Sequence, residues 1–168
     1  VYNAVSSGVV VIMAAGNHSR TLGSEISVSP AMVGSSLPGA ITVGSIDAYS
    51  GRLSNFSNYG NLVEIATVGS LDSSQSSVAS GLFSTGTNQN YQRLMGTSQA
   101  APIITAAATL LVQFFKQNSV IYSPADIENI ILASTDTNAT VPIASNRVFN
   151  FSKLVRNAYT FADINLCK

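Results

Sequence analysis

Apolar runs alternate with polar, glycine-rich stretches along the chain, and this pattern predicts strands and helices joined by loops. Residues 9–15 are apolar at every position, which is typical of a strand in the middle of a parallel sheet covered by helices. Further strands are predicted at residues 40–46 and 62–66, and a hairpin at residues 82–85 and 91–95. The polar stretches predict loops at residues 18–36 and 47–60 and an exposed excursion at residues 69–81.

Helical signals occur at the start of the chain and in its second half. Residues 1–8 have the pattern of the last turns of a helix, with Gly8 as its C-terminal stop. Residues 97–117 predict a helix packed on most of its faces, because apolar residues recur at helical spacing and many of the others are small. Ser123-Pro124-Ala125-Asp126 predicts the start of a helix that runs to about residue 133, and residues 152–161 predict a third, shorter one.

Composition and charge narrow the functional classes. The 168 residues are 46% apolar and 10% charged, which favours one folded domain over a disordered chain. Eight basic residues balance eight acidic ones, so nucleic acid and anionic membranes are not expected partners. The most apolar stretch, residues 100–115, is shorter than a membrane span and contains Pro102, which favours a buried helix. The single Cys167 excludes an internal disulfide and leaves open a free thiol or a bond to another chain.

Two polar segments lie where chemistry is expected in such a fold. Asn17 directly follows the apolar strand, and α/β sheets bind ligands at the carboxyl ends of their strands. Gly96-Thr97-Ser98 places a hydroxyl in the first turn of a helix, where backbone N–H groups are unpaired and the helix dipole favours negative charge. A serine there can attack a carbonyl while its own N–H stabilises the oxyanion. The same serine could instead be an N-cap without chemistry.

Several segments follow one another in the order of a known protease family. They are Ala14-Ala15-Gly16-Asn17, Leu37-Pro38-Gly39-Ala40-Ile41-Thr42-Val43-Gly44, Phe56-Ser57-Asn58-Tyr59-Gly60, Ile65-Ala66-Thr67-Val68-Gly69, Phe83-Ser84-Thr85 and Gly96-Thr97-Ser98-Gln99-Ala100-Ala101-Pro102. Together they resemble the subtilisin-like serine proteases (subtilases, peptidase family S8) over nearly the whole chain. Two departures from the family pattern are Gln99 in place of a Met and Ala106 in place of a Gly of the nucleophile helix.

The resemblance implies a fold, a reaction and a set of site residues. The implied fold is a three-layer α/β architecture with a doubly wound, mostly parallel sheet, of which residues 1–168 are the C-terminal portion. Ser98 would be the nucleophile of a serine endopeptidase that cleaves peptide bonds through an acyl-enzyme. Asn17 and the Ser98 N–H would form the oxyanion hole. The implied substrate-binding residues are Ala14, Ala15, Gly16, Gly96 and Thr97.

The other half of the family's catalytic apparatus is not in this sequence. Its Asp-x-Gly and His-Gly-Thr motifs do not occur, and the only histidine, His18, is expected to be an exposed loop residue. We therefore expect the Asp and the His to come from the N-terminal half of the same protease, and this chain alone to be inactive. Peptide substrates and a propeptide inhibitor are the other expected partners. No cofactor is expected from the sequence, and the structural calcium known in the family has no identifiable site.

Three further expectations concern location and alternatives. A surface rich in Ser and Asn and poor in charge favours a secreted, cell-surface or periplasmic protein. An esterase or lipase with a nucleophile elbow at Ser98 is excluded within the chain, because that fold requires a histidine after the serine. A catalytically inactive pseudoprotease or a partner-binding fragment of a divergent subtilase is the alternative that the sequence leaves open.

Overall fold

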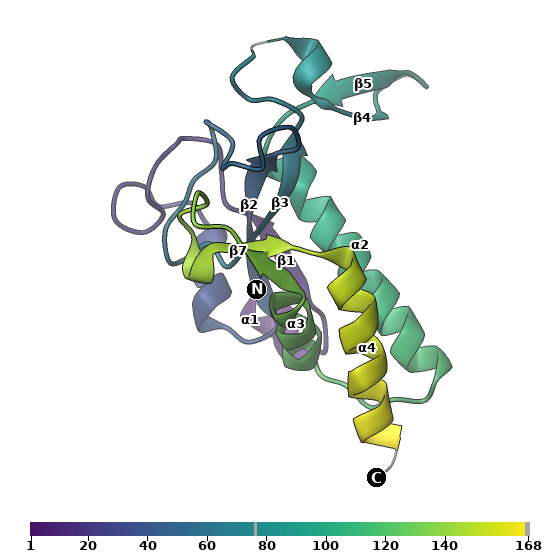
Figure 1. The fold of residues 1–168 in the computed structure, drawn as a ribbon. Helices are drawn as coiled ribbons and strands as arrows, with labels where there is room; N and C mark the ends of the chain where they lie inside the picture. Colours follow the sequence, from purple (N-terminus) through teal and green to yellow (C-terminus); the bar gives the residue numbers. More distant parts are fainter. Residues whose placement is uncertain (76, 167–168) are drawn as a thin grey trace.

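The structure, a computed structural model, describes residues 1–75 and 77–166. Within these residues the main sheet has five strands in the order β1-β2-β3-β7-β6 (Figure 1). The strands β1, β2, β3 and β7 are parallel to their neighbours, and β6 runs antiparallel to β7. Their bounds are β1 Val11–Ala14, β2 Ala40–Asp47, β3 Ile65–Ser70, β6 Thr135–Thr137 and β7 Arg147–Phe149. The expectation of an α/β fold with a mostly parallel sheet is therefore confirmed.

The helices cover one face of this sheet and irregular segments cover the other. The longest helices are α2 (Thr97–Gln117), α3 (Pro124–Ala133) and α4 (Phe151–Leu166), which pack on one another and on β2 and β3 around the larger apolar core. A second, smaller apolar core is formed by other side chains of the sheet, by the 3₁₀ helix η1 (Ala31–Ser36) and by loops. A short helix, α1 (Tyr2–Ser6), opens the chain and stops before Gly8, as predicted.

Local signals predicted the start of α3 and the hairpin correctly. The Ser123 hydroxyl accepts the Asp126 N–H at 3.3 Å, and the Asp126 carboxylate accepts the Ser123 N–H at 2.8 Å, which closes the capping box at the start of α3. The strands β4 (Leu82–Thr85) and β5 (Tyr91–Leu94) form the predicted antiparallel hairpin. Figure 1 shows this hairpin projecting away from the main sheet. Both features depend on residues close in sequence, which is why they could be predicted.

Several boundary predictions were wrong. The strand expected at residues 62–66 is β3, which starts later and runs to Ser70. Part of the expected excursion at residues 69–81 is therefore buried, since Ser70, Ser73 and Ser80 are each less than 9% exposed. Ser70 and Ser73 are hydrogen-bonded to a buried carboxylate, described below, and the Ser80 carbonyl accepts the Leu71 N–H at 2.7 Å. The final helix α4 is longer than the expected residues 152–161. Residue 76, within the expected excursion, and Cys167 lie outside the described residues.

The predicted surroundings of β1 and α2 were also wrong for this chain. The strand β1 was expected in the middle of the sheet, but it lies at an edge and is half-buried. The helix α2 was expected to be packed on most faces, but only one face is buried, and Thr105, Ala106 and Thr109 on the other are exposed. By length and apolarity α2 could cross a membrane, and its buried face packs against β1, β2 and β3.

A pair of buried carboxyl groups joins α3 to the sheet. Glu64 precedes β3 and accepts the Thr42 N–H at 3.0 Å, and Glu128 of α3 accepts the Gly39 N–H at 2.5 Å. Both side chains are less than 10% exposed. Burial, with a smaller contribution from the neighbouring Glu128, raises the pKa of Glu64 to about 7, and burial also raises the pKa of Glu128.

This pair predicts a loss of stability with rising pH. Below the ordinary Glu pKa of 4.5 the Glu64 carboxyl is protonated in both the folded and unfolded states, so folding carries no penalty from it. Between 4.5 and about 7 the unfolded state ionises first, and stability falls. We expect Glu64→Gln to reduce this slope and to leave the contribution of Glu128, measured as the urea midpoint against pH in the protein that carries this chain. Asp163→Asn, at an exposed position of α4, is the control. An unchanged slope in Glu64→Gln would contradict the assignment.

Candidate active site

The carboxyl end of β1 meets the first turn of α2 through Asn17 and Thr97. The Asn17 Oδ1 atom accepts the Thr97 N–H at 2.9 Å and the Thr97 hydroxyl at 2.9 Å. The Thr97 Oγ1 atom in turn accepts the Gly16 N–H at 3.1 Å. Thr97 is completely buried, whereas Asn17 is exposed, so these contacts join a buried side chain to the surface. The two segments that the sequence analysis singled out are thus bound directly to each other.

This contact determines which way the Asn17 amide points. The backbone N–H of Thr97 can only donate, so the Asn17 atom that faces it must be the carbonyl oxygen. The Nδ2 group therefore points away from Thr97, and it has no acceptor among residues 1–75 and 77–166. Gly96 leaves space for it: a Cβ at Gly96 would lie 3.1 Å from Nδ2, and the Gly96 φ of 154° disfavours other residues. Asn17 consequently presents two unpaired N–H donors beside the start of α2.

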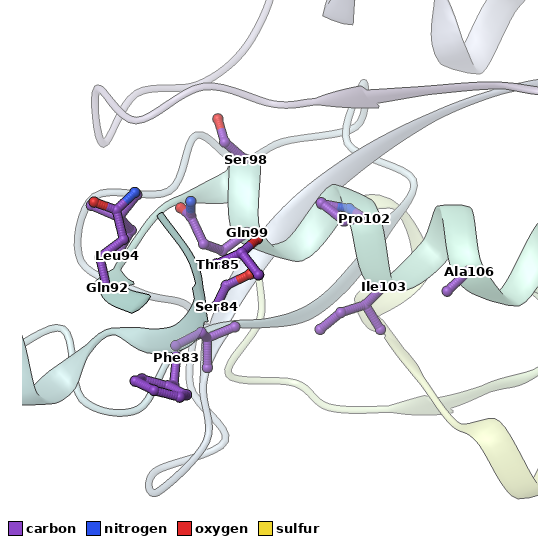
Figure 2. A pocket seen from close by; sticks show the side chains of 11 residues that line it. Phe83, Ser84, Thr85, Gln92, Leu94, Ser98, Gln99, Pro102, Ile103 and Ala106 are labelled. Carbon is purple, nitrogen blue, oxygen red and sulfur yellow. The ribbon is translucent and has the colours of Figure 1, made fainter. Parts of the chain in front are cut away.

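Ser98 contributes a further N–H donor and a hydroxyl group at this position. It is exposed, and it is the second residue of α2. Neither its backbone N–H nor its hydroxyl has a hydrogen-bond partner in the part of the chain that the structure describes. In Figure 2 the Ser98 hydroxyl points away from the Gln99, Thr85 and Ser84 side chains. Unpaired N–H groups at a helix N-terminus attract negative charge, so an oxyanion formed beside Ser98 would be stabilised there.

A buried asparagine in the predicted loop at residues 47–60, for which no site role was expected, supports the Asn17 loop. Asn58 is completely buried, and its Nδ2 group donates to the Ala15 carbonyl at 2.8 Å. Its Oδ1 atom accepts the backbone N–H groups of His18 at 3.1 Å and Arg20 at 3.3 Å. Asn58 therefore holds the chain on both sides of Asn17. The sequence indicated this role only through an amide close to the aromatic residues Phe56 and Tyr59. The partners of Asn58 are about 40 residues away in sequence and could not be predicted from it.

A cavity of about 600 Å³ lies beside Ser98, between α2 and the β4–β5 hairpin (Figure 2). Gln99, Pro102 and Ile103 line it from α2, and Phe83 and Leu94 line it from the hairpin. The hairpin is exposed: the Phe83 ring stacks on Tyr91 at 5.2 Å, and the Arg93 guanidinium lies 5.3 Å from the Phe83 ring centre. The cavity walls are mainly apolar, which suits an apolar side chain of a bound peptide.

The residues expected to bind substrate lie around Ser98 but not in this cavity. None of Ala14, Ala15, Gly16, Gly96 and Thr97 is among its lining residues. The Ala15 side chain is completely buried in the smaller core, and Gly96 is buried as well. The expectation that these five residues bind substrate stays a prediction, and in this structure Ala15 could contribute only with its backbone.

The described residues bring no acid or base to Ser98. His18 is exposed, as predicted, and no hydrogen bond joins its side chain to Ser98 among residues 1–75 and 77–166. Within the same residues no group of three or more His, Cys, Asp and Glu side chains could hold a metal ion. Among the described residues the arrangement is thus an exposed serine hydroxyl with N–H donors beside it and with no histidine or acidic side chain bonded to it.

Comparisons with known proteins agree with this arrangement. The family model described as "Subtilase family" matches residues 1–151. The chain is 36% identical over 115 residues to the extracellular serine proteinase of Thermus sp. and 33% identical over 137 residues to alkaline serine exoprotease A of Vibrio alginolyticus. These alignments cover 68% and 82% of this chain but only 24% and 22% of the two proteinases. The chain therefore spans about a quarter of the length of the curated relatives it matches.

Solved structures of proteases have the same fold. A protease of Pseudoalteromonas arctica superposes with a TM-score of 0.75 at 27% identity, over 92% of this chain and 44% of that protein. A cold-adapted subtilisin-like serine proteinase superposes with a TM-score of 0.69 at 27% identity, over 88% of this chain and 47% of that one. The matched region is about half of each of these larger structures.

Proposed function

Because this chain belongs to the subtilase family of serine proteases, we propose that it is the nucleophile-bearing part of a serine endopeptidase. In this proposal the Ser98 oxygen attacks the carbonyl carbon of a peptide bond, and its proton passes to a histidine base. The C–N bond then breaks as that proton is given to the leaving amine, and water hydrolyses the remaining ester. The product is a carboxylic acid, and Ser98 is regenerated.

The observation that carries the proposal is the pair of N–H donors, from the Asn17 side chain and the Ser98 backbone, beside the Ser98 hydroxyl. The Asn17 Nδ2 group, oriented by Thr97, and the unpaired Ser98 N–H both serve the oxygen that becomes negative when Ser98 attacks. Such donors act most strongly when they are fixed before the charge develops, because no reorganisation is then needed. Asn17 is fixed on its oxygen side by Thr97 and along its backbone by Asn58. The alternative of Ser98 as an N-cap is wrong, because the N-cap of α2 is Gly96 and Ser98 is the second residue of the helix.

We assign the missing acid and base to the N-terminal half of the same protease. Two features of the fold are consistent with a neighbour there. The edge strand β1 leaves one side unpaired within the described residues, and the exposed face of α2 beside it carries small side chains such as Thr105 and Thr109. Small residues allow close packing of another element. On this proposal residues 1–168 alone do not hydrolyse peptides.

We propose that the cavity between α2 and the hairpin receives part of the substrate, since Ser98 forms one of its edges. Peptide and protein substrates and a propeptide inhibitor are the proposed partners. Secretion is also proposed, since two of the relatives are named as an extracellular proteinase and an exoprotease.

The test is covalent labelling with a fluorophosphonate, which reacts with activated serines. In the protein that carries this chain together with its upstream half, we expect labelling at Ser98, located by mass spectrometry of the labelled peptide. Residues 1–168 alone and the Ser98→Ala variant are expected not to label. If the folded protein does not label at Ser98 while a control subtilase does, the inactive pseudoprotease is the correct interpretation.

A further inference from the structure

A buried aspartate at the end of β2 has no part in the proposed reaction, although it lies near the nucleophile turn. Asp47 is only 7% exposed. Its Oδ1 atom accepts the Ser73 N–H at 3.0 Å and the Ser70 hydroxyl, and its Oδ2 atom accepts the Ser73 hydroxyl at 2.8 Å. A buried carboxylate requires such partners, and it binds them more strongly than a neutral acceptor would.

The hydroxyl bound to Asp47 continues into a chain of buried serines. The Ser70 and Ser54 oxygens are 3.0 Å apart, and the Ser54 and Ser45 oxygens are 2.7 Å apart. All three serines are buried. The chain therefore runs from the end of β3 back to the middle of β2, with Asp47 as the charged acceptor at one end.

Between these contacts β3 has a bulge at Gly69. Ile46 pairs with Val68, but Asp47 pairs with Ser70, so Gly69 is an extra residue in the register of β2 and β3. The Gly69 carbonyl accepts the Gly96 N–H at 3.0 Å. A Cβ at Gly69 would lie 2.5 Å from the Gly96 oxygen, so only glycine allows the two backbones to come this close. The bulge thus holds the residue that begins the nucleophile turn.

We propose that Asp47 is a positioning residue for Ser98. By binding Ser70 it fixes the bulge at Gly69, and Gly69 fixes Gly96 at the start of the turn that carries Thr97 and Ser98. Asp47 touches neither substrate nor the reacting atoms, so it acts through this backbone contact. The assignment rests on the proposed function, since positioning is meaningful only if Ser98 reacts.

The experiment compares Asp47→Asn with wild type in the full protein. Active sites are counted by complete fluorophosphonate labelling, and kcat and KM for a chromogenic peptide are expressed per labelled site. A displaced nucleophile turn lowers kcat and leaves peptide binding unchanged, so we expect kcat to fall about 10- to 100-fold with KM nearly constant. Ser70→Ala keeps the Asp47 carboxylate and its Ser73 contacts, so it should show a smaller fall in kcat. This variant is used for the test if Asp47→Asn does not fold.

The matched control is Glu128→Gln, which alters another buried carboxylate at a distance from the Gly69 bulge. It should change the melting temperature without changing kcat per labelled site. If Asp47→Asn retains the wild-type kcat per labelled site and changes only the melting temperature, as the control does, the assignment is overturned. If wild type neither labels nor hydrolyses the peptide, the proposed function itself fails.

Discussion

Replacing Ser98 with alanine is expected to lower kcat for peptide hydrolysis on the order of 10⁶-fold in the protein that carries this chain. The reason is that no other group can form the acyl-enzyme at this position: Ser98 is the exposed hydroxyl beside the Asn17 amide, and the neighbouring Thr97 hydroxyl is buried in contact with Asn17. The measurement is the steady-state rate with a chromogenic peptide, after removal of any contaminating protease. Binding of a peptide product should be nearly unchanged, because the serine hydroxyl contributes to the transition state.

The control for this variant is Ser35→Ala, which removes an exposed hydroxyl in η1. It should retain the wild-type kcat and melting temperature. If Ser98→Ala keeps more than about a thousandth of the wild-type rate in a pure preparation, a group other than Ser98 carries the reaction. That result would contradict the assignment of the nucleophile.

Asn17→Ala is expected to lower kcat about 10²- to 10³-fold with little change in KM. In the proposed reaction the Nδ2 donor serves the oxyanion, which exists only after attack, so its loss weakens the transition state more than the bound substrate. The free energy of unfolding should also fall, because the Thr97 N–H and hydroxyl lose their acceptor. Activity is therefore compared per labelled active site at a temperature where both proteins are folded.

Thr97→Val is the informative companion to Asn17→Ala. It removes the hydroxyl that bonds Asn17 but leaves the Asn17 amide in place, so kcat should fall by less than in Asn17→Ala. Asn61→Ala, at an exposed turn, is the control and should behave as wild type. If Asn17→Ala raises KM and leaves kcat unchanged, Asn17 binds substrate and is not the oxyanion donor.

The parts of the fold and site that could be predicted are those encoded by residues close in sequence or by the general rule for parallel sheets. The start of α2 at Thr97 follows from Gly96 and the helical spacing after it. The meeting of Asn17 with that helix start follows because both lie at the carboxyl edge of the sheet. The capping box of α3 lies within four consecutive residues.

The parts that could not be predicted depend on polar contacts between distant segments. The sequence around Asn58 predicts only a turn. Its support of the site depends on its burial under the Asn17 loop, where it bonds the Ala15 carbonyl. The true extent of β3 depends on Asp47, which allows small polar residues such as Ser70 to continue a buried strand. The strands β6 and β7 are three residues each and have no apolar run long enough to indicate them.

The hairpin of β4 and β5 has a consequence for how such a protein can diversify. Its aromatic side chains stack on each other and not in either apolar core, and most of its residues are exposed. Mutations at Phe83, Tyr91 or Leu94 should therefore cost little folding free energy. Two of these residues, Phe83 and Leu94, line the cavity beside Ser98, whereas Asn17, Thr97 and Asn58 are held by contacts elsewhere. If the chain acts as proposed, substrate preference can thus drift by mutation in the hairpin while the residues around Ser98 stay under separate selection.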